Sequence, residues 1–460
     1  MTQQKQDSKV PRKEKWAFFI VNVANIPIMT LIGYFLLIFY TDVAGLPPAV
    51  IGTLFLISKI FDGINDPIMG YIIDHLPKTK LGRFRSYLII GAVLCSLNYA
   101  LMWLGPSLAN NMTIKIVIAY VAYLTFGFTF DLMDIPLNSM IPVMSDLDND
   151  RNTLSNIKGA GYVIGAIIFA GGGLFFVQLF TSERVGYHTL IVFASAFTLI
   201  FSIIGTMGIR ERIEPVKKQK YSMRDIFKII GAKPVLILFL DMLISGIGAG
   251  IGGAVGIYFF EYALGRPELF TYTALSLIGG VLIGVLIAPS IIKRVGKKRA
   301  KFLSALPGLI SAIILFFTPT YNAITFVIIP LYTSWGTGIS QLLSYNIQAD
   351  NMDFIEWKHG FRAEGAVASL TSFIVKASGG LGTAIAAYAL GFIGYIPNQV
   401  QSSFTIQGFY WLSYAIPAFF TVISLLIWSF YPLTEGIRQQ MMKDLIEQRN
   451  AYRISTNDES

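Results

Sequence analysis

The sequence predicts an all-α membrane protein with twelve transmembrane helices arranged as two pseudo-symmetric halves of six. The chain of 460 residues is 54% hydrophobic and only 14% charged, whereas soluble globular proteins average about 25% charged residues. Long apolar stretches recur along it, and its basic residues gather in alternate connections. These observations exclude a soluble enzyme, a nucleic-acid-binding module and a disordered protein as first interpretations.

Each predicted span is an apolar stretch long enough to cross a bilayer, which takes roughly 20 residues at a rise of about 1.5 Å. Strands are excluded because the stretches are far longer than barrel strands and do not alternate. No small-residue cleavage site follows the first stretch, so we expect it to remain as a helix. The predicted spans are 16–40, 49–74, 84–104, 113–144, 156–180, 187–209, 234–263, 269–292, 299–319, 322–348, 364–392 and 405–432.

The basic residues orient the predicted helices, because positive charge accumulates in cytoplasmic loops. With the N-terminus inside, the outer connections hold only Lys115, Arg184 and Arg266, and nearly all other Lys and Arg residues lie on the cytoplasmic side. We therefore expect a multi-pass protein of the cell membrane with both termini cytoplasmic. The formal charge of +9 then reflects orientation and not nucleic-acid binding, and we expect a monomer in the lipid bilayer.

The longest polar connection divides the predicted spans into two halves that resemble each other. Basic turns follow the second and eighth spans, and acidic–basic loops follow the fourth and tenth. Two related six-helix halves are the layout of the major facilitator fold, with a substrate cavity near the midplane. Glycines in the seventh span are expected to pack helices closely. The expected parts are an N-tail 1–15, a first half 16–209, a central loop 210–233, a second half 234–432 and a C-tail 433–460.

Charged side chains inside a predicted span are functional candidates, because a charge at bilayer depth costs several kcal/mol unless it is paired or hydrated. Lys59 and Asp66 of the second span are separated by about two helical turns, so they share a face with Asp62. Asn65 extends this polar stripe. Such oxygens suit a small cation or a proton, whereas the structural alternative is a Lys59–Asp62 pair that merely neutralises itself.

The fourth and eleventh spans contribute further candidates. Asp131 and Asp134 are three residues apart and share a face of the fourth span. Lys376 stands in the middle of the eleventh span with Ser372 one turn before it, too central to reach the interface easily. We therefore expect Lys376 to pair with a carboxylate or to donate a hydrogen bond to a substrate.

Two cytoplasmic loops at equivalent places in the halves combine acidic and basic residues. We hypothesise that they form ion pairs that hold the cytoplasmic side closed, and the alternative is a solvated acidic loop. The candidate gating residues are Asp146, Asp148, Asp150, Arg151, Asp350, Glu356 and Arg362.

Several motifs follow one another along the chain. They are Thr-Asp-Val-Ala-Gly at 41–45, Asp-Gly-Ile-Asn-Asp-Pro-Ile-Met-Gly at 62–70, Leu-Gly-Arg-Phe-Arg at 81–85, Asp-Ile-Pro at 134–136, Asp-Arg at 150–151, Ala-Asp at 349–350 and Glu-Trp-Lys-His-Gly-Phe-Arg-Ala-Glu-Gly at 356–365. Together with Lys376 they resemble the glycoside–pentoside–hexuronide:cation symporter family, of which the melibiose carrier is the best-known type. The resemblance covers nearly the whole chain.

This resemblance implies secondary active transport, in which a sugar or glycoside moves with a cation by alternating access. It implies that Asp62, Asn65 and Asp66 lie at the cation site. It also implies that Asp134 joins the cation and sugar sites and that Lys376 is the family's lysine of the eleventh span.

Departures from the family's pattern show that the resemblance does not extend to galactoside specificity. Asn25 lies beside the position of a sugar-binding aspartate, and Asn138 and Gln341 fall at or near positions of tryptophans. Lys158 or its neighbour replaces an arginine, and Asp131 replaces a threonine. The candidate cation-binding residues are thus Asp62, Asn65, Asp66 and Asp131, and the candidate substrate-binding residues are Asp134, Asn25, Asn138, Lys158, Gln341, Ser372 and Lys376.

No cofactor is expected, and the coupling ion is a proton or Na⁺. We expect Asp62, Asp66, Asp131 and Asp134 to crowd one cavity, with Lys59 and Lys376 as its only bases. Repulsion between like charges and loss of hydration both favour a protonated carboxyl, so we favour the proton. Sodium would instead need about six oxygen ligands, which the same cluster could provide.

Two alternative functions stay open. A lysolipid or other amphiphile:cation symporter of the same fold would suit an aliphatic cavity without the usual tryptophans. A membrane glycosyltransferase using the D-x-D patterns of Asp146, Asp148 and Asp150 is more remote, because no soluble catalytic domain accompanies them. ATP-driven transport is excluded because the phosphate-binding motif G-x-x-x-x-G-K-[ST] does not occur. The single cysteine and the spacing of the three histidines exclude internal disulfides and make a zinc site unexpected.

Overall fold

The computed structural model describes residues 10–75, 77, 79–145, 147–212, 229–317, 325–359 and 364–458. Within these ranges the protein is helical, and the β pairing consists of a single isolated bridge between Thr79 and Gly82. The prediction of an all-α protein is therefore confirmed.

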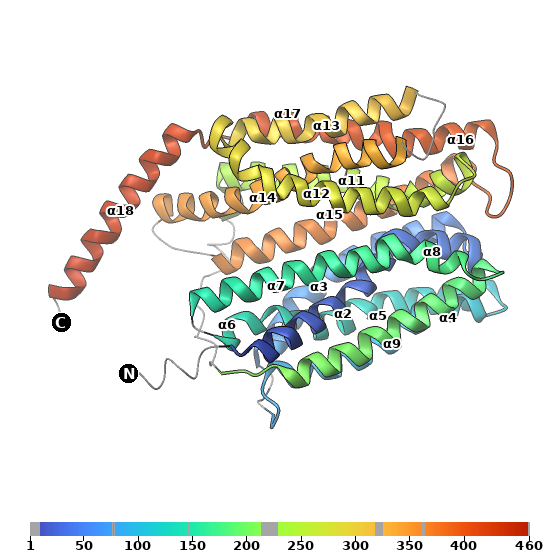
Figure 1. Ribbon diagram of the computed structural model, residues 1–460, viewed down its shortest axis with the longest axis horizontal. Coiled ribbons are helices and arrows are strands. Elements are labelled where there is room, and N and C mark those ends of the chain that lie inside the picture. Colours follow the sequence, from blue (N-terminus) through green and yellow to red (C-terminus); the bar gives the residue numbers. More distant parts are fainter. Residues whose placement is uncertain are drawn as a thin grey trace. The chain divides into compact units, whose positions relative to one another are not determined.

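The first half of the chain forms helices that can be followed from blue to green in Figure 1. Two short π-helical turns, here labelled η, interrupt the helices of this half: α2 ends in η1, and α7 continues through η2 into α8. The elements are α2 (Arg12–Ile38), η1 (Phe39–Val43), α3 (Pro48–His75), α4 (Phe84–Leu108), α5 (Met112–Asn138), α6 (Met140–Met144), α7 (Asp148–Ala166), η2 (Ile167–Gly171), α8 (Gly172–Gln178) and α9 (Glu183–Gly208).

The second half repeats this pattern of long helices and ends in an additional polar one. The elements are α11 (Lys233–Tyr258), η3 (Phe259–Ala263), α12 (Glu268–Val295), α13 (Lys297–Phe317), α14 (Thr325–His359), α15 (Glu364–Phe392), α16 (Ser403–Tyr410), η4 (Trp411–Ala415), α17 (Ile416–Ser429) and α18 (Glu435–Asp458).

Local sequence explains several helix boundaries. Asn111 precedes α5, and its side-chain oxygen accepts the backbone N–H of Thr113 at 2.8 Å, as an N-cap residue does. Helices α12 and α13 are separated by Gly296 alone, whose φ of +79° is accessible to glycine at little cost. The sequence thus specifies both the start of α5 and the tight turn between α12 and α13.

Ten helices of the described part are long and apolar enough to cross a bilayer, and they correspond to ten of the twelve expected spans. The two remaining expected spans coincide with α3 and α14, which have 28 and 35 residues. Lys59, Asp62 and Asp66 interrupt the apolar stretch of α3. Large apolar side chains such as Leu286 and Phe392 are exposed, as contact with lipid requires.

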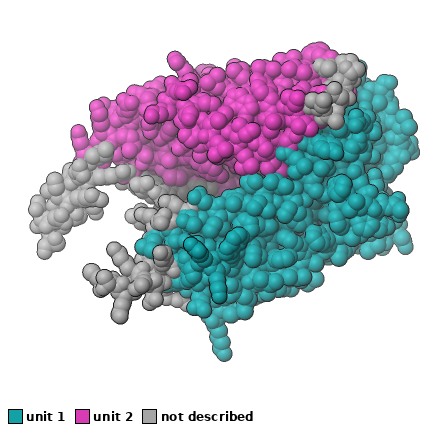
Figure 2. All heavy atoms as spheres, in the orientation of Figure 1, with its two compact units in different colours: residues 1–217, 253–275, 383–409 teal, residues 218–252, 276–382, 410–460 magenta. Residues whose placement is uncertain are grey.

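The chain divides into two compact units, which Figure 2 shows in different colours. The first unit comprises residues 1–217, 253–275 and 383–409, and the second comprises residues 218–252, 276–382 and 410–460. The ends of α11, α12, α15 and α16 therefore belong to the first unit, together with the helices of the first half.

Glycines of α11 pack this helix against its neighbours in the second unit, as the sequence predicted. A Cβ atom on Gly246 would lie 2.1 Å from Ser378 Oγ of α15, and one on Gly250 would lie 2.6 Å from the Gly379 carbonyl oxygen. Gly248 meets α17 in the same way, because its Cβ would lie 2.8 Å from Phe420 Cβ. A side chain at these positions would force the helices apart.

The Leu-Gly-Arg-Phe-Arg turn before α4 is organised by Glu211. The carboxylate of Glu211 accepts hydrogen bonds from the backbone N–H groups of Arg83 and Arg85 at 2.9 and 2.8 Å. It thereby satisfies donors that have no partner within the helix, and its negative charge interacts favourably with the positive end of the helix dipole. Gly82 has a φ of +114°, and a Cβ there would lie 2.6 Å from Glu211 Oε1. The motif therefore requires glycine for this close approach.

Candidate functional site

The polar stripe of α3 contains an ion pair inside the first unit. Lys59 Nζ lies 2.6 Å from Asp62 Oδ2, and both side chains are about four-fifths buried, with exposed fractions of 18% and 23%. Gly127 of α5 permits this arrangement, since a Cβ at that position would lie 3.0 Å from Asp62 Oδ1. Asp62 is thus partly neutralised by Lys59, and its second oxygen faces α5.

Asn65 joins the stripe on α3 to the carboxylates of α5. Its Nδ2 donates a hydrogen bond of 2.8 Å to Asp131 Oδ2, and both residues are buried. Its Oδ1 is buried and accepts no hydrogen bond from the described residues. A buried amide oxygen without a donor is costly, and amide and carboxylate oxygens are the ligands that hard cations use. The Asn65 amide oxygen and the Asp131 carboxylate can therefore bind a cation or accept a hydrogen bond from a protonated group.

Asp134, one helical turn along α5, connects two further helices. Its Oδ1 accepts a hydrogen bond of 2.9 Å from Asn25 Nδ2 of α2, and its Oδ2 accepts one of 2.7 Å from Asn138 Nδ2. Lys158 Nζ of α7 donates to Asn138 Oδ1. Asn25 Oδ1 is a second buried amide oxygen without a hydrogen-bond partner among the described residues. Helices α2, α3, α5 and α7 thus contribute to two adjacent polar clusters on α5.

The structure therefore brings together most of the residues that the sequence singled out in the first half. They lie on four helices, and their amides donate hydrogen bonds to Asp131 and Asp134, as buried carboxylates require. The side chain of Asp66 lies outside the described residues.

The second unit contains a cavity of about 640 Å³ whose wall is rich in hydroxyl groups. Among the predicted substrate-binding residues, Gln341 lines it, whereas Ser372 is exposed and Lys376 is half-buried outside its lining. The lining residues are Met242, Ser245, Gly246, Ala249, Gly250, Lys301, Ser304, Ala305, Gly308, Thr333, Gly336, Thr337, Ser340, Gln341, Ser344, Val375, Ser378, Gly379, Thr421, Ser424 and Leu425.

A buried ion pair beside this cavity was missed by the sequence analysis. Lys301 Nζ of α13 lies 2.8 Å from Asp241 Oδ2 of α11, with exposed fractions of 11% and 2% for the two side chains. Asp241 lies within the predicted span 234–263, so the criterion applied to Asp62 would have found it. Lys301 closes a run of basic residues at the start of α13, so its sequence context indicates a cytoplasmic loop and not a partner for Asp241.

Two of the candidate gating residues, Asp150 and Arg151, contact other described residues of the first unit. Asp150 accepts hydrogen bonds from Lys15 Nζ and the Val10 backbone N–H at 2.7 and 2.9 Å, and Arg151 Nε donates to the Ser145 carbonyl at 2.8 Å. Glu356 is half-buried. Asp146 and Arg362 lie outside the described residues, as does the side chain of Asp148.

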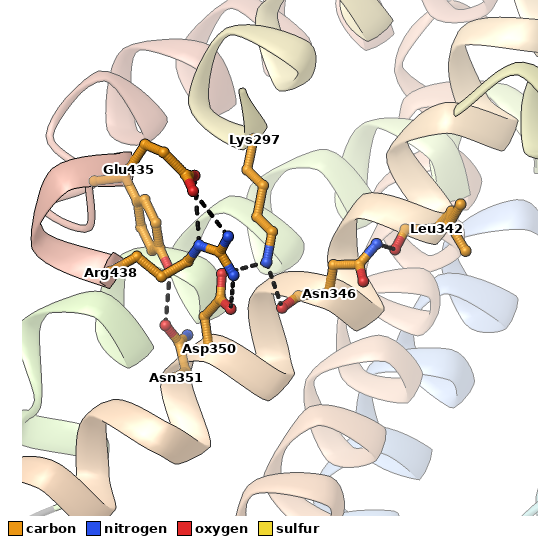
Figure 3. A network of polar contacts seen from close by, with 8 residues as sticks. Lys297, Leu342, Asn346, Asp350, Asn351, Glu435 and Arg438 are labelled. Atoms are coloured by element: carbon orange, nitrogen blue, oxygen red, sulfur yellow. Dashed lines mark hydrogen bonds and ion pairs between the residues drawn. The ribbon is translucent and has the colours of Figure 1, made fainter. Parts of the chain in front are cut away.

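Asp350 belongs to a network that joins α13, α14 and α18, shown in Figure 3. Its carboxylate lies 2.5 Å from Lys297 Nζ and 3.7 Å from Arg438 Nη1. Arg438 also contacts Glu435 at 2.8 Å, and this hydrogen bond holds the pKa of the Glu435 carboxyl below its ordinary value of 4.5. The network attaches the start of the C-terminal helix to the end of α14.

A second cluster that sequence reasoning missed surrounds Asp42 in η1, within the first unit. Tyr395 Oη donates a hydrogen bond of 2.6 Å to its carboxylate, and Tyr262 Oη and Thr41 Oγ1 donate as well. Asn398 Nδ2 donates to the Asp42 carbonyl at 2.9 Å. Asp42 belongs to the Thr-Asp-Val-Ala-Gly motif, which marks it as a candidate residue in the sequence. The tyrosines and the asparagine that contact it come from η3 and from the loop after α15, which the motif does not indicate.

Comparisons with known proteins match nearly the whole chain. Residues 18–435 match the model of a family described as MFS/sugar transport protein. The uncharacterized symporter YjmB of Bacillus subtilis is 30% identical over 95% of this chain and 96% of its own length. A putative sulfoquinovose importer of Escherichia coli is 27% identical, covering 98% and 97% of the two chains. An isoprimeverose transporter of Lactiplantibacillus pentosus is 28% identical, covering 98% and 94%.

Solved structures share the fold at low sequence identity. The crystal structure of a D-xylose-proton symporter matches 92% of this chain and 98% of its own, with a TM-score of 0.62 and 14% identity. The helical architecture described above is therefore that of major facilitator transporters.

Proposed function

Because this chain belongs to the MFS/sugar transport protein family and is a membrane transporter rather than an enzyme, we propose that it carries a sugar or glycoside in symport with a cation by alternating access. The observation that carries this proposal is the polar network on α2, α3, α5 and α7. Charged groups at membrane depth mark pathways for ions and substrates. Here Asn25 and Asn65 donate to carboxylates of α5, and the buried oxygens of these two amides have no donor in the described part of the chain.

The charges of this network support a cation as the second solute. Among the side chains described, Asp62, Asp131 and Asp134 face Lys59 and Lys158, so the carboxylates exceed the ammonium groups. A proton on one carboxyl, or a bound cation, restores neutrality. We favour the proton, because titration of one carboxyl needs no further ligands, whereas sodium would need about six oxygens.

The cavity of the second unit supports a polyhydroxylated substrate. Nine of its lining side chains are serine or threonine, and Gln341 and Lys301 add donors. Sugars are held by such groups, whereas the acyl chain of a lysolipid needs an apolar surface. Relatives described as an isoprimeverose transporter and a putative sulfoquinovose importer support the same class of substrate.

We further propose that both termini lie in the cytoplasm of a cell-membrane protein that works as a monomer. The distribution of basic residues supports this orientation. It places the Asp150 and Asp350 networks on the inner side and the Asp42 cluster on the outer side. In this proposal the inner networks, with Arg362, stabilise the state that is closed to the cytoplasm.

Uptake into proteoliposomes tests the function. Purified protein would be offered isoprimeverose, sulfoquinovose, methyl β-D-glucoside, methyl β-D-glucuronide and lysophosphatidylcholine, each with an inward proton gradient, an inward sodium gradient or neither. We expect at least one sugar to accumulate above its external concentration only when a cation gradient is present. Gradient-independent equilibration of every sugar, or movement of lysophosphatidylcholine alone, would contradict the proposal.

A further inference from the structure

Among the described residues that line the cavity of the second unit, Lys301 alone carries a charge. The others are small, apolar or neutral polar. The side chain of Lys301 is nearly nine-tenths buried, with an exposed fraction of 11%. An ammonium group in such a place must be compensated nearby or it would lose its proton.

The compensation comes from a carboxylate behind the cavity wall. Asp241 does not line the cavity, and its side chain is only 2% exposed. Its Oδ2 lies 2.8 Å from Lys301 Nζ, and its Oδ1 accepts a hydrogen bond from Ser424 Oγ of α17. Both carboxylate oxygens therefore have a donor, as a buried charge requires.

The ammonium group of Lys301 has three N–H donors, and the structure accounts for two of them. One is directed to Asp241 and one to Ser340 Oγ of α14, at the longer distance of 3.3 Å. The Trp428 ring lies on another side of the ammonium, with its centroid 6.0 Å away. The remaining donor capacity is available to a molecule in the cavity.

This arrangement gives the site a net charge of zero before a substrate enters. A hydroxyl or ring oxygen can accept a hydrogen bond from Lys301 without changing that balance. A carboxylate or sulfonate would place a second negative charge beside an ammonium that Asp241 already neutralises, in a region of low dielectric constant where repulsion is strong.

We propose that Lys301 is a substrate-binding residue that donates a hydrogen bond to a hydroxyl of a neutral polyol, and that Asp241 is a positioning residue that sets a preference for neutral over acidic sugars. The inference rests on the proposed sugar transport. Ser424 supports the site by holding Asp241 toward Lys301.

Competition experiments test the charge preference. Methyl β-D-glucoside and methyl β-D-glucuronide differ only in a hydroxymethyl or carboxylate group at C6, and each would compete with uptake of whichever neutral sugar accumulates. We expect the wild-type protein to bind the glucoside at least about tenfold more tightly, the size of one hydrogen bond to a charged group. Asp241→Asn leaves Lys301 uncompensated, so the ratio of the two inhibition constants should shift by about tenfold or more toward the glucuronide.

Two further variants of this pair separate specificity from folding. Asp241→Glu keeps the charge and should retain the preference for the glucoside. Lys301→Met should weaken the binding of the glucoside, measured as its inhibition constant, by about tenfold. If Asp241→Asn does not fold, the double variant Asp241→Asn with Lys301→Met, which has neither charge, should bind the glucoside about tenfold more weakly, because the hydrogen bond from the ammonium group is lost.

Asp350→Asn serves as the matched control, since it breaks another ion pair of α13, the one between Lys297 and Asp350 of α14, away from the cavity. It should leave the ratio unchanged even if it lowers the amount of protein, because a loss of folded protein affects both competitors equally.

Each outcome bears on one of the two proposals. An unchanged ratio in Asp241→Asn, an unchanged affinity of the double variant for the glucoside, or a wild-type preference for the glucuronide overturns the assignment of Lys301 and Asp241 and leaves sugar transport intact. Absence of sugar accumulation by the wild-type protein overturns the proposed function, and the inference with it.

Discussion

Substitution of Asp42 by Asn should loosen the outer end of the first unit. The Asp42 carboxylate accepts hydrogen bonds from Tyr262 and Tyr395, which belong to the second half of the sequence. Hydrogen bonds to a charged group contribute about 1.5–3 kcal/mol each and neutral ones about 0.5–1.5 kcal/mol. The amide should therefore lose about 1 kcal/mol per tyrosine, or about 2 kcal/mol in all, which is about a 30-fold change in the equilibrium between closed and open forms of this contact.

Cysteine labelling from outside the cell measures this change. Thr53 Oγ1 lies 2.7 Å from Tyr388 Oη in the same unit, so Thr53→Cys reports on whether α3 and α15 stay in contact near this end. The native chain contributes little background, because its single cysteine, Cys95, is buried. Adding Asp42→Asn should raise the rate of reaction with a membrane-impermeant maleimide by up to about 30-fold.

Tyr40→Phe is the matched control for this experiment. Tyr40 lies in the same π-helical turn, but its hydroxyl donates to the Met102 carbonyl of α4 at 2.8 Å, which joins helices of the first half only. Its loss should cost stability and leave the labelling rate unchanged. Equal labelling of Thr53→Cys with and without Asp42→Asn would refute the reasoning.

Four further predictions concern coupling, the driving ion and the cytoplasmic side. Asp62→Asn should abolish uphill accumulation yet leave counterflow exchange measurable, because the amide keeps the size and loses the charge; normal accumulation would remove Asp62 from the cation site. Uptake should respond to a pH gradient without sodium, and Asp131→Thr should weaken that response; a strict need for sodium would reverse the assignment. Arg362→Glu should increase labelling of cysteines placed on the cytoplasmic side, and no increase would indicate a solvated loop. The Glu435–Arg438 pair stabilises α18 fully above the ordinary Glu pKa of 4.5, and this stabilisation is lost as the pH falls through the lowered pKa of Glu435. Arg438→Gln should therefore abolish the part of α18 proteolysis that depends on acid pH. An unchanged dependence of proteolysis on pH would count against the pair.

Most of the fold and the first polar network could be predicted from the sequence. Bilayer thickness converts apolar stretches directly into helices, which explains why ten of the twelve expected spans coincide with long apolar helices. Helical periodicity likewise predicts which residues of one helix meet. Lys59 and Asp62 are three residues apart, and they form the ion pair that their spacing suggested.

Contacts between helices could not be predicted from the sequence, because the spacing of residues along one helix carries no information about which helix packs beside it. Asp42 and Tyr395 are 353 residues apart in the chain, and nothing near either residue indicates the other. Asp241 and Lys301 form a buried pair although they lie on different helices, α11 and α13, and nothing near either residue in the sequence indicates the other. The sequence by itself therefore determined the membrane architecture and the residues on each helical face. Tertiary packing decided which carboxylates are neutralised from another helix, and by which partners, because burial turns an unpaired charge into a large energetic cost.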